Sequence, residues 1–510
     1  MKKSPTISDG IFRIVIVILV VFIQFVLLVV FVAVLKQYTI YAFFLMELAG
    51  VIEVLLLVDK NKTSEYTTKW LLVILIIPVL GHLLYLLWGR RKIDSKKSKR
   101  IHRLLSTRNQ WLSDNSQAVH ELQQRFPEHK KLSTYLQKEG FTVYKNTTCK
   151  YYPLGKLQFD DMLIDLNNAK RFIFLEYFTI SEGPLWNSIH RVLKEKASAG
   201  VEIRLLYDDL GSILTLPDNF IQTLTNENIQ VLRFNAVHKH LSRFYFNYRN
   251  HQKLAVIDGQ IGYTGGNNLA DEYIKAVQGG DQRRDSAIRL TGDAVWNLTV
   301  TFLQMWETES NATENYSRYH TDKMAIGDGF YLPFNDGPMN YPNNPTEAAY
   351  RQMIYSAQNY LWIATPYLMI DDLMVDTLCF VSRSGVDVRI ITSKKWHHFY
   401  ENMVTHTHYS KLLEAGIHIY EYTPGYIHAK TILSDDTHAI TGSVNMNYHS
   451  FYLHFTNGVW ICGAPMLTDM KKDIVETLTI CKEISFQAWE KRPLHIKLIE
   501  KFFRLLIPIL

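Results

Sequence analysis

Two copies of one short motif constrain this chain of 510 residues more than any other feature. The pattern H-x-K-x4-D occurs at residues 251–258 and again at 428–435. Each copy is followed, 14 residues after its histidine, by Gly-(Gly/Ser)-x-Asn. From composition alone, the H-x-K-x4-D pattern is expected about 0.05 times in such a chain. Two copies with equal downstream spacing therefore indicate an internal duplication.

The segments around the motifs repeat as well, on either side of a loop rich in Gly, Pro and Asn at 327–345. Each half is predicted to contain a strand, a helix and a second strand, at 171–177, 185–199 and 201–207, and again at 360–367, 373–384 and 386–391. This order is typical of a parallel sheet covered by helices. We therefore expect an α/β protein with two similar halves, each built on a mixed, largely parallel sheet.

The motif residues suit phosphate chemistry. His251 and Lys253 are two residues apart, so on a β-strand their side chains point to the same face. Buried cations need partners, whereas a histidine beside a fixed positive charge is well placed to bind and attack a phosphate group. The candidate catalytic residues are His251, Lys253, Asp258, His428, Lys430 and Asp435, and we expect the two aspartates to fix the strand ends and the local charge rather than to react.

Three apolar runs precede the duplicated region, at 14–35, 40–58 and 70–88. The second run contains Glu47 and Glu53, which are costly in lipid, so a buried or re-entrant helix is the alternative for that run. A cluster of Lys and Arg follows the third run, which predicts a cytoplasmic exit and attraction to anionic lipids. We expect a multi-pass anchor of two or three helices in the cell membrane, with the side of the N-terminus left open.

Charge is divided unevenly along the chain. Residues 1–105 hold 15 Lys/Arg and 6 Asp/Glu, a net of +9, so the remainder carries 6 − 9 = −3. A slightly acidic remainder argues against a nucleic-acid partner, which would need a basic stripe. The four cysteines are far apart and show no zinc-binding spacing, so we expect free thiols and no metal.

The paired motifs resemble those of the phospholipase D superfamily. The segment from Trp70 to Arg90 resembles the anchor of its bacterial cardiolipin synthase branch, and four other segments resemble that branch as well: 175–177, 207–212, 364–367 and 445–450. The resemblance covers nearly the whole chain. It implies two halves packed about a pseudo-twofold axis, with both motifs in one site.

The resemblance also implies a reaction. Two phosphatidylglycerol molecules would give cardiolipin and glycerol through a phosphatidyl-histidine, without metal or cofactor. His251 is the expected nucleophile and His428 the acid, although a near-symmetric site permits either order. Lysines 253 and 430 would hold the phosphate oxygens, with Asn268 and Asn445 as neutral donors. A phospholipase D-type hydrolase, or a transferase with another acceptor alcohol, is the enzymatic alternative; a weakened membrane scaffold is the non-enzymatic one.

One departure from the family pattern concerns the carboxylate that orients each histidine. Asp285 supplies it after the first motif, but Thr456 stands where the family usually has Glu. Asn447 and His449 also replace the usual Asp and Arg. A hydroxyl stabilises an imidazolium far less than a carboxylate does, so the orientation of one ring is left open.

The expected organisation follows from these features. We predict an anchor with a basic segment at 1–105, a first half at 106–326, a second half at 327–490 and an amphipathic tail at 491–510. The tail mixes basic and apolar residues, so it is expected either to dock within the fold or to lie in a membrane interface. Expected partners are phosphatidylglycerol and other anionic phospholipids; the sequence does not indicate an oligomeric state.

Overall fold

The computed structural model describes residues 96–112, 115–236, 248–275, 282–310, 312–321, 326–340, 343–395 and 399–505, with scattered positions before residue 86. Backbone contacts divide the chain into two compact units. The large unit comprises 94–395 and 409–491, and the small unit comprises 1–93, 396–408 and 492–510. Both halves of the duplicated region lie in the large unit, except for residues 396–408 of the second half.

The predicted membrane-spanning runs at 14–35, 40–58 and 70–88 fall almost entirely outside the described residues. Within the described part of the chain, no helix combines the length and the apolar character needed to span a membrane.

Short helices lead into the first half, and strands and helices then alternate. The entry helices are α5 (Lys96–Ser106), α6 (Ser116–Arg125) and α7 (Lys130–Lys138). The elements of the first half are β1 (Thr147–Tyr152), α8 (Gly155–Asn168), β2 (Phe172–Tyr177), α9 (Pro184–Ser198), β3 (Glu202–Asp208), α10 (Asp209–Ser212), α11 (Phe220–Asn226), β4 (Gln230–Phe234), β5 (Arg249–Asn250), β6 (Leu254–Ile257), β7 (Ile261–Gly265), β8 (Gln282–Arg284), β9 (Ala287–Gly292) and α13 (Val295–Ser310).

The second half repeats this order and adds elements at its end. They are β10 (Phe330–Asp336), α14 (Pro345–Ser356), β11 (Tyr360–Ala364), α15 (Asp372–Arg383), β12 (Asp387–Ser393), α16 (Phe399–Glu414), β13 (His418–Tyr422), β14 (Gly425–Ile427), β15 (Thr431–Ser434), β16 (His438–Gly442), α17 (Tyr448–Tyr452), β17 (His454–Cys462), α18 (Met466–Thr479), β18 (Cys481–Glu483), α19 (Phe486–Glu490) and α20 (Leu494–Leu505).

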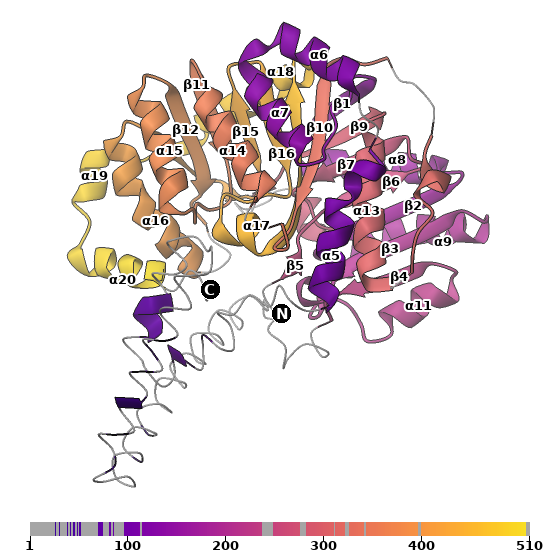
Figure 1. Ribbon diagram of the computed structural model, residues 1–510, viewed down its shortest axis with the longest axis horizontal. Coiled ribbons are helices and arrows are strands. Elements are labelled where there is room, and N and C mark those ends of the chain that lie inside the picture. Colours follow the sequence, from indigo (N-terminus) through magenta and orange to yellow (C-terminus); the bar gives the residue numbers. More distant parts are fainter. Residues whose placement is uncertain are drawn as a thin grey trace. The chain divides into compact units, whose positions relative to one another are not determined.

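The two sheets have the same strand order, which confirms the duplication. The first runs β1-β9-β7-β6-β2-β3-β4, and the second runs β10-β17-β16-β15-β11-β12-β13 with β18 added at the edge. Figure 1 shows them side by side, the first in magenta and the second in orange, and β16 contacts β7 and β9 where they meet.

The expectation of largely parallel sheets is wrong. In the first sheet only β2–β3 and β3–β4 are parallel, whereas β1–β9, β9–β7, β7–β6 and β6–β2 are antiparallel. The strand–helix–strand segments do form the parallel part. Each motif strand, however, turns back as a tight hairpin, β6–β7 or β15–β16, which adds the antiparallel part.

Helices cover both faces of the first sheet. Helices α8, α9 and α11 bury apolar side chains against one face of β2, where Ile173, Leu175 and Tyr177 belong to the same core cluster. On the opposite face Phe174 stacks on Phe302 of α13, with ring centroids 4.6 Å apart. Alternate side chains of β2 therefore pack into hydrophobic cores on opposite faces of the sheet. This packing keeps β2, the neighbour of motif strand β6, rigid.

Candidate active site

The backbone before each motif histidine pairs with the opposite half. Strand β5 pairs with β17, and β14 pairs with β8. The His251 N–H donates to the Phe455 carbonyl at 2.8 Å, and the His428 N–H donates to the Arg284 carbonyl at 2.6 Å. Each half thus holds the other half's histidine, so the two motifs form one site and neither is complete alone.

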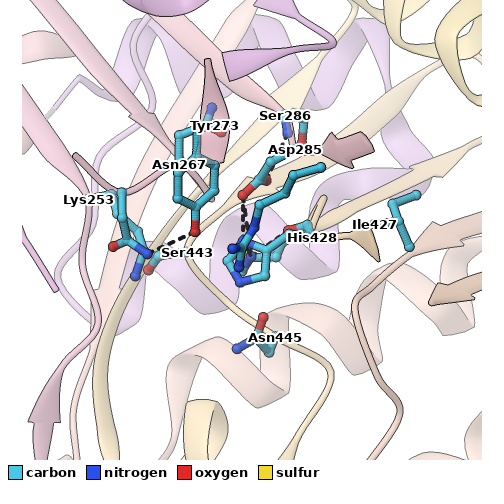
Figure 2. A network of polar contacts seen from close by, with 12 residues as sticks. Lys253, Asn267, Tyr273, Asp285, Ser286, Ile427, His428, Ser443 and Asn445 are labelled. Atoms are coloured by element: carbon cyan, nitrogen blue, oxygen red, sulfur yellow. Dashed lines mark hydrogen bonds and ion pairs between the residues drawn. The ribbon is translucent and has the colours of Figure 1, made fainter. Parts of the chain in front are cut away.

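The ring of His428 is oriented by a carboxylate from the first half. The Nδ1 atom of His428 lies 2.5 Å from Oδ2 of Asp285 (Figure 2). Asp285 directly follows Arg284, whose carbonyl accepts the His428 N–H. Asp285 is buried and also accepts the Ser286 N–H at 2.8 Å. When the Nδ1–H group donates a hydrogen bond to the carboxylate, the Nε2 atom of His428 is available to exchange a proton with substrate.

A glycine of the first motif makes room for this carboxylate. A Cβ atom on Gly266 would lie 2.1 Å from Oδ1 of Asp285. At the equivalent position of the second half, Ser443 is tolerated. The first half thus combines Gly266 with Asp285, whereas the second half combines Ser443 with Thr456 at the equivalent positions.

Thr456 does not orient His251. By the symmetry of the site it occupies the place equivalent to Asp285, but it is fully buried and its hydroxyl donates to the Ser450 carbonyl at 3.3 Å. The Nδ1 atom of His251 instead lies 3.0 Å from the Ser443 carbonyl oxygen. Because a carbonyl only accepts, Nδ1 carries the proton and Nε2 carries a lone pair. The ring is held in the tautomer of a nucleophile.

Cations surround the two imidazoles. Lys253 Nζ donates to the His251 carbonyl at 2.7 Å, and Lys430 Nζ makes the equivalent bond to the His428 carbonyl. Burial lowers the pKa of both lysines, that of Lys430 to about 8. Burial, then the positive charge of Lys430, Arg283 and Lys253, lowers the pKa of His428. An anionic phosphodiester in this site would offset that repulsion, so substrate itself would favour protonation of these groups.

The two predicted asparagine donors occupy matching places near the site. Asn268 Nδ2 donates to the Tyr273 hydroxyl at 3.0 Å, and Asn445 Nδ2 donates to the Tyr367 hydroxyl at 3.1 Å. Both side chains are buried. Their role as phosphate ligands stays a prediction.

The motif aspartates bind backbone rather than imidazole. Asp258 accepts the N–H groups of residues 170, 171 and 172 at 2.7–3.0 Å. Asp435 accepts those of residues 358, 359 and 360 at 2.8–2.9 Å. Both have φ of +53°, a left-handed conformation that Asp tolerates well. They tie each motif hairpin to the start of the neighbouring strand, a structural contribution to the site.

Several groups that position the site carry little sequence signal. Glu176 of β2 accepts hydrogen bonds from Asn250 and Gln252, on either side of His251, at 2.6 and 3.2 Å. Asp208 accepts the Asn250 N–H at 2.8 Å and caps α10. The Ser443 carbonyl is a backbone group and could not be identified from residue types. Glu176 could have been suspected, because it is the only acid in the otherwise apolar strand β2, and Asp208, because it ends β3.

The arrangement can carry out a two-step displacement at phosphorus. A neutral imidazole, His251, presents Nε2 as the attacking atom, while the His428–Asp285 pair can give a proton to a leaving oxygen and take it back. Lysines 253 and 430 supply positive charge for the non-bridging oxygens. Among the described residues, no group of three or more His, Cys, Asp or Glu side chains is placed to hold a metal ion.

Comparison with known proteins gives a consistent result. A family model described as the cardiolipin synthase PLD-like domain matches residues 162–306 and 350–477. One described as the phospholipase D-nuclease N-terminal region matches residues 48–90. Cardiolipin synthase of Oceanobacillus iheyensis is 30% identical over 92% of this chain and 98% of its own length. Cardiolipin synthase of Staphylococcus aureus strain Mu50 is 31% identical over 88% and 92%.

Among solved structures, a phosphatidylserine synthase from Haemophilus influenzae superimposes with a TM-score of 0.57. The match covers 72% of this chain and 97% of that chain at 13% identity, a likeness of fold alone.

Proposed function

Because this chain belongs to the cardiolipin synthase family of phospholipase D-like proteins, we propose that it is a phosphatidyltransferase that makes cardiolipin. The observation that carries the proposal is the composite site, in which each half binds the backbone of the other half's histidine. The substrates that fit are two phosphatidylglycerol molecules, and the products are cardiolipin and glycerol.

In the first step, Nε2 of His251 attacks the phosphorus of one phosphatidylglycerol. The P–O bond to the glycerol headgroup breaks, and the glycerol oxygen takes a proton from Nε2 of His428. In the second step, a headgroup hydroxyl of another phosphatidylglycerol gives its proton back to His428 and attacks phosphorus. The P–N bond breaks, His251 is regenerated, and cardiolipin leaves.

A membrane anchor is part of the same proposal. Both substrates are confined to a lipid leaflet, and the family model for the N-terminal region matches residues 48–90, within the apolar part of the sequence. Runs 14–35, 40–58 and 70–88 would cross the cell membrane, and the basic segment from Arg90 to Arg103 would leave the large unit on the cytoplasmic face.

Product analysis tests the proposal against hydrolysis. The full chain in detergent micelles is given phosphatidylglycerol labelled in the phosphate, with and without EDTA. We expect labelled cardiolipin and an equal amount of glycerol in both samples. Phosphatidic acid as the only product would show a hydrolase. A new diester formed only when another alcohol is added would show a transferase with a different acceptor.

The pH dependence of the reaction should be bell-shaped. Burial raises the pKa of Asp285 to about 6 and lowers that of Lys430 to about 8. The Asp285–His428 pair needs the carboxylate, which is present above its pKa, whereas phosphate binding needs the Lys430 ammonium, which is lost above its pKa. We therefore expect kcat/KM for phosphatidylglycerol to fall below about pH 6 and above about pH 8. Initial rates over this range measure it, and a flat profile would contradict it.

A further inference from the structure

Helix α20 in the small unit turns its apolar side chains toward solvent. Leu494, Leu498, Ile499 and Phe502 are 71%, 57%, 44% and 57% exposed. A surface helix of a globular protein normally buries such a stripe. Four large apolar side chains on one short helix form a contiguous face rather than the scattered exposure that needs no explanation.

The acidic residue of the same helix is turned inward. Glu500 is only 2% exposed, and its carboxylate binds Arg492 through two contacts, at 2.6 and 3.1 Å, and His406 at 3.4 Å. Phe503 packs edge-on against Phe399 of α16, with ring centroids 5.6 Å apart. This ion pair and this aromatic contact help to fix the helix in the small unit, with its apolar face pointing outward.

Basic residues border that apolar face. At 100° per residue, Lys497, Lys501 and Arg504 fall along one edge of the stripe formed by residues 494, 498 and 502, between it and Glu500. Lys501 is exposed. The only acidic residue of α20 is Glu500, which is already neutralised by Arg492. An apolar face with a basic edge is the pattern of a helix that lies in an anionic membrane surface.

We propose that α20 binds the interface of a membrane that contains anionic phospholipid, with Leu494, Leu498, Ile499 and Phe502 in the acyl boundary and Lys501 at the headgroups. A second copy of the chain fits less well, because protein interface cores are depleted in lysine. One face of a helix of 12 residues is also smaller than the roughly 1,000 Å² that a stable dimer needs. The proposal concerns where α20 lies, and its test measures contact with lipid rather than formation of product, so its failure and that of the proposed reaction are separate results.

The test places a reporter on the helix in the full chain. Cys149 and Cys481, the partly exposed thiols, are replaced by Ala, and single variants Leu498→Cys, Phe502→Cys and Leu157→Cys carry a polarity-sensitive fluorophore. Leu157 lies on α8 of the large unit and is 47% exposed, so it serves as the matched control. Each protein is reconstituted in vesicles of phosphatidylcholine with phosphatidylglycerol brominated in its acyl chains.

We expect the fluorophores at 498 and 502 to lose at least about half of their emission to the brominated lipid, and the one at 157 to lose little. Adding Lys497→Glu with Lys501→Glu should reduce the loss at 498 severalfold. Equal quenching at 498 and 157 would overturn the proposal, as would quenching that is unaffected by the charge reversal. A spectral shift at 498 that depends on protein concentration without lipid would instead show that a second copy covers the face.

Discussion

Replacing His428 by Asn, or His251 by Asn, should each lower kcat for cardiolipin formation by at least about 10³-fold. His251 is the proposed attacking group and His428 the proposed proton donor, and each is held by a backbone bond to the other half. The two losses should not multiply in the double variant, because both residues serve the same displacement. Initial rates with labelled phosphatidylglycerol, normalised to folded protein, measure the effect.

A matched control keeps this test specific. His438 is a buried histidine of β16 that accepts a hydrogen bond from Trp460 Nε1 and stacks on His129. Replacing it by Asn should affect stability more than kcat per folded molecule. If His428→Asn retained more than about one tenth of the wild-type kcat, the two-histidine mechanism would be wrong, since acid–base catalysis contributes about 10²-fold or more.

Replacing Asp285 by Asn should lower kcat by about 10²- to 10³-fold, whereas Thr456→Val should change it by less than about 3-fold. Asp285 binds Nδ1 of His428 at 2.5 Å, and an amide there no longer stabilises the imidazolium. The Thr456 hydroxyl donates to the Ser450 carbonyl and not to the His251 ring. The two positions are related by the duplication, so each variant serves as the control for the other.

A pH profile separates orientation from general damage. The Asp285→Asn enzyme should lose the fall in kcat/KM near pH 6, because the group that titrates there is absent. An equal loss of activity in both variants would contradict the asymmetry of the site. It would mean that Thr456 acts on His251 in solution despite its bond to Ser450.

Much of the fold could be predicted because the strands and helices have local, periodic sequence patterns that recur in both halves. The predicted strand at 201–207 corresponds to β3 at Glu202–Asp208, and the predicted helix at 373–384 corresponds to α15 at Asp372–Arg383. The direction of strand pairing was harder to predict. The turn at Asp258-Gly259-Gln260 reverses the chain within three residues, and a short apolar run before such a turn does not reveal which neighbour it will pair with.

The parts of the site that depend on side-chain type could be predicted, whereas the parts that depend on backbone hydrogen bonds could not. His251, Lys253, His428, Lys430 and Asp285 are brought together, as the paired motifs indicate. Two short strands, β5 and β14, exchange between the halves, and two or three residues carry no periodic signal. The hydrogen-bond acceptor of His251 Nδ1 could not be predicted either. It is the backbone carbonyl of Ser443, a group that every residue has.

Trapping the covalent intermediate tests the central claim most directly. The donor is phosphatidylglycerol labelled in its phosphate and methylated on both headgroup hydroxyls, so that it can give its phosphatidyl group but cannot accept one. After an alkaline quench and proteolysis, the label should lie on the peptide that contains His251. A chase with unmodified phosphatidylglycerol should move it into cardiolipin. Label on the peptide that contains His428, or a chase that yields only phosphatidic acid, would contradict transfer through a phosphatidyl-His251 to a lipid alcohol.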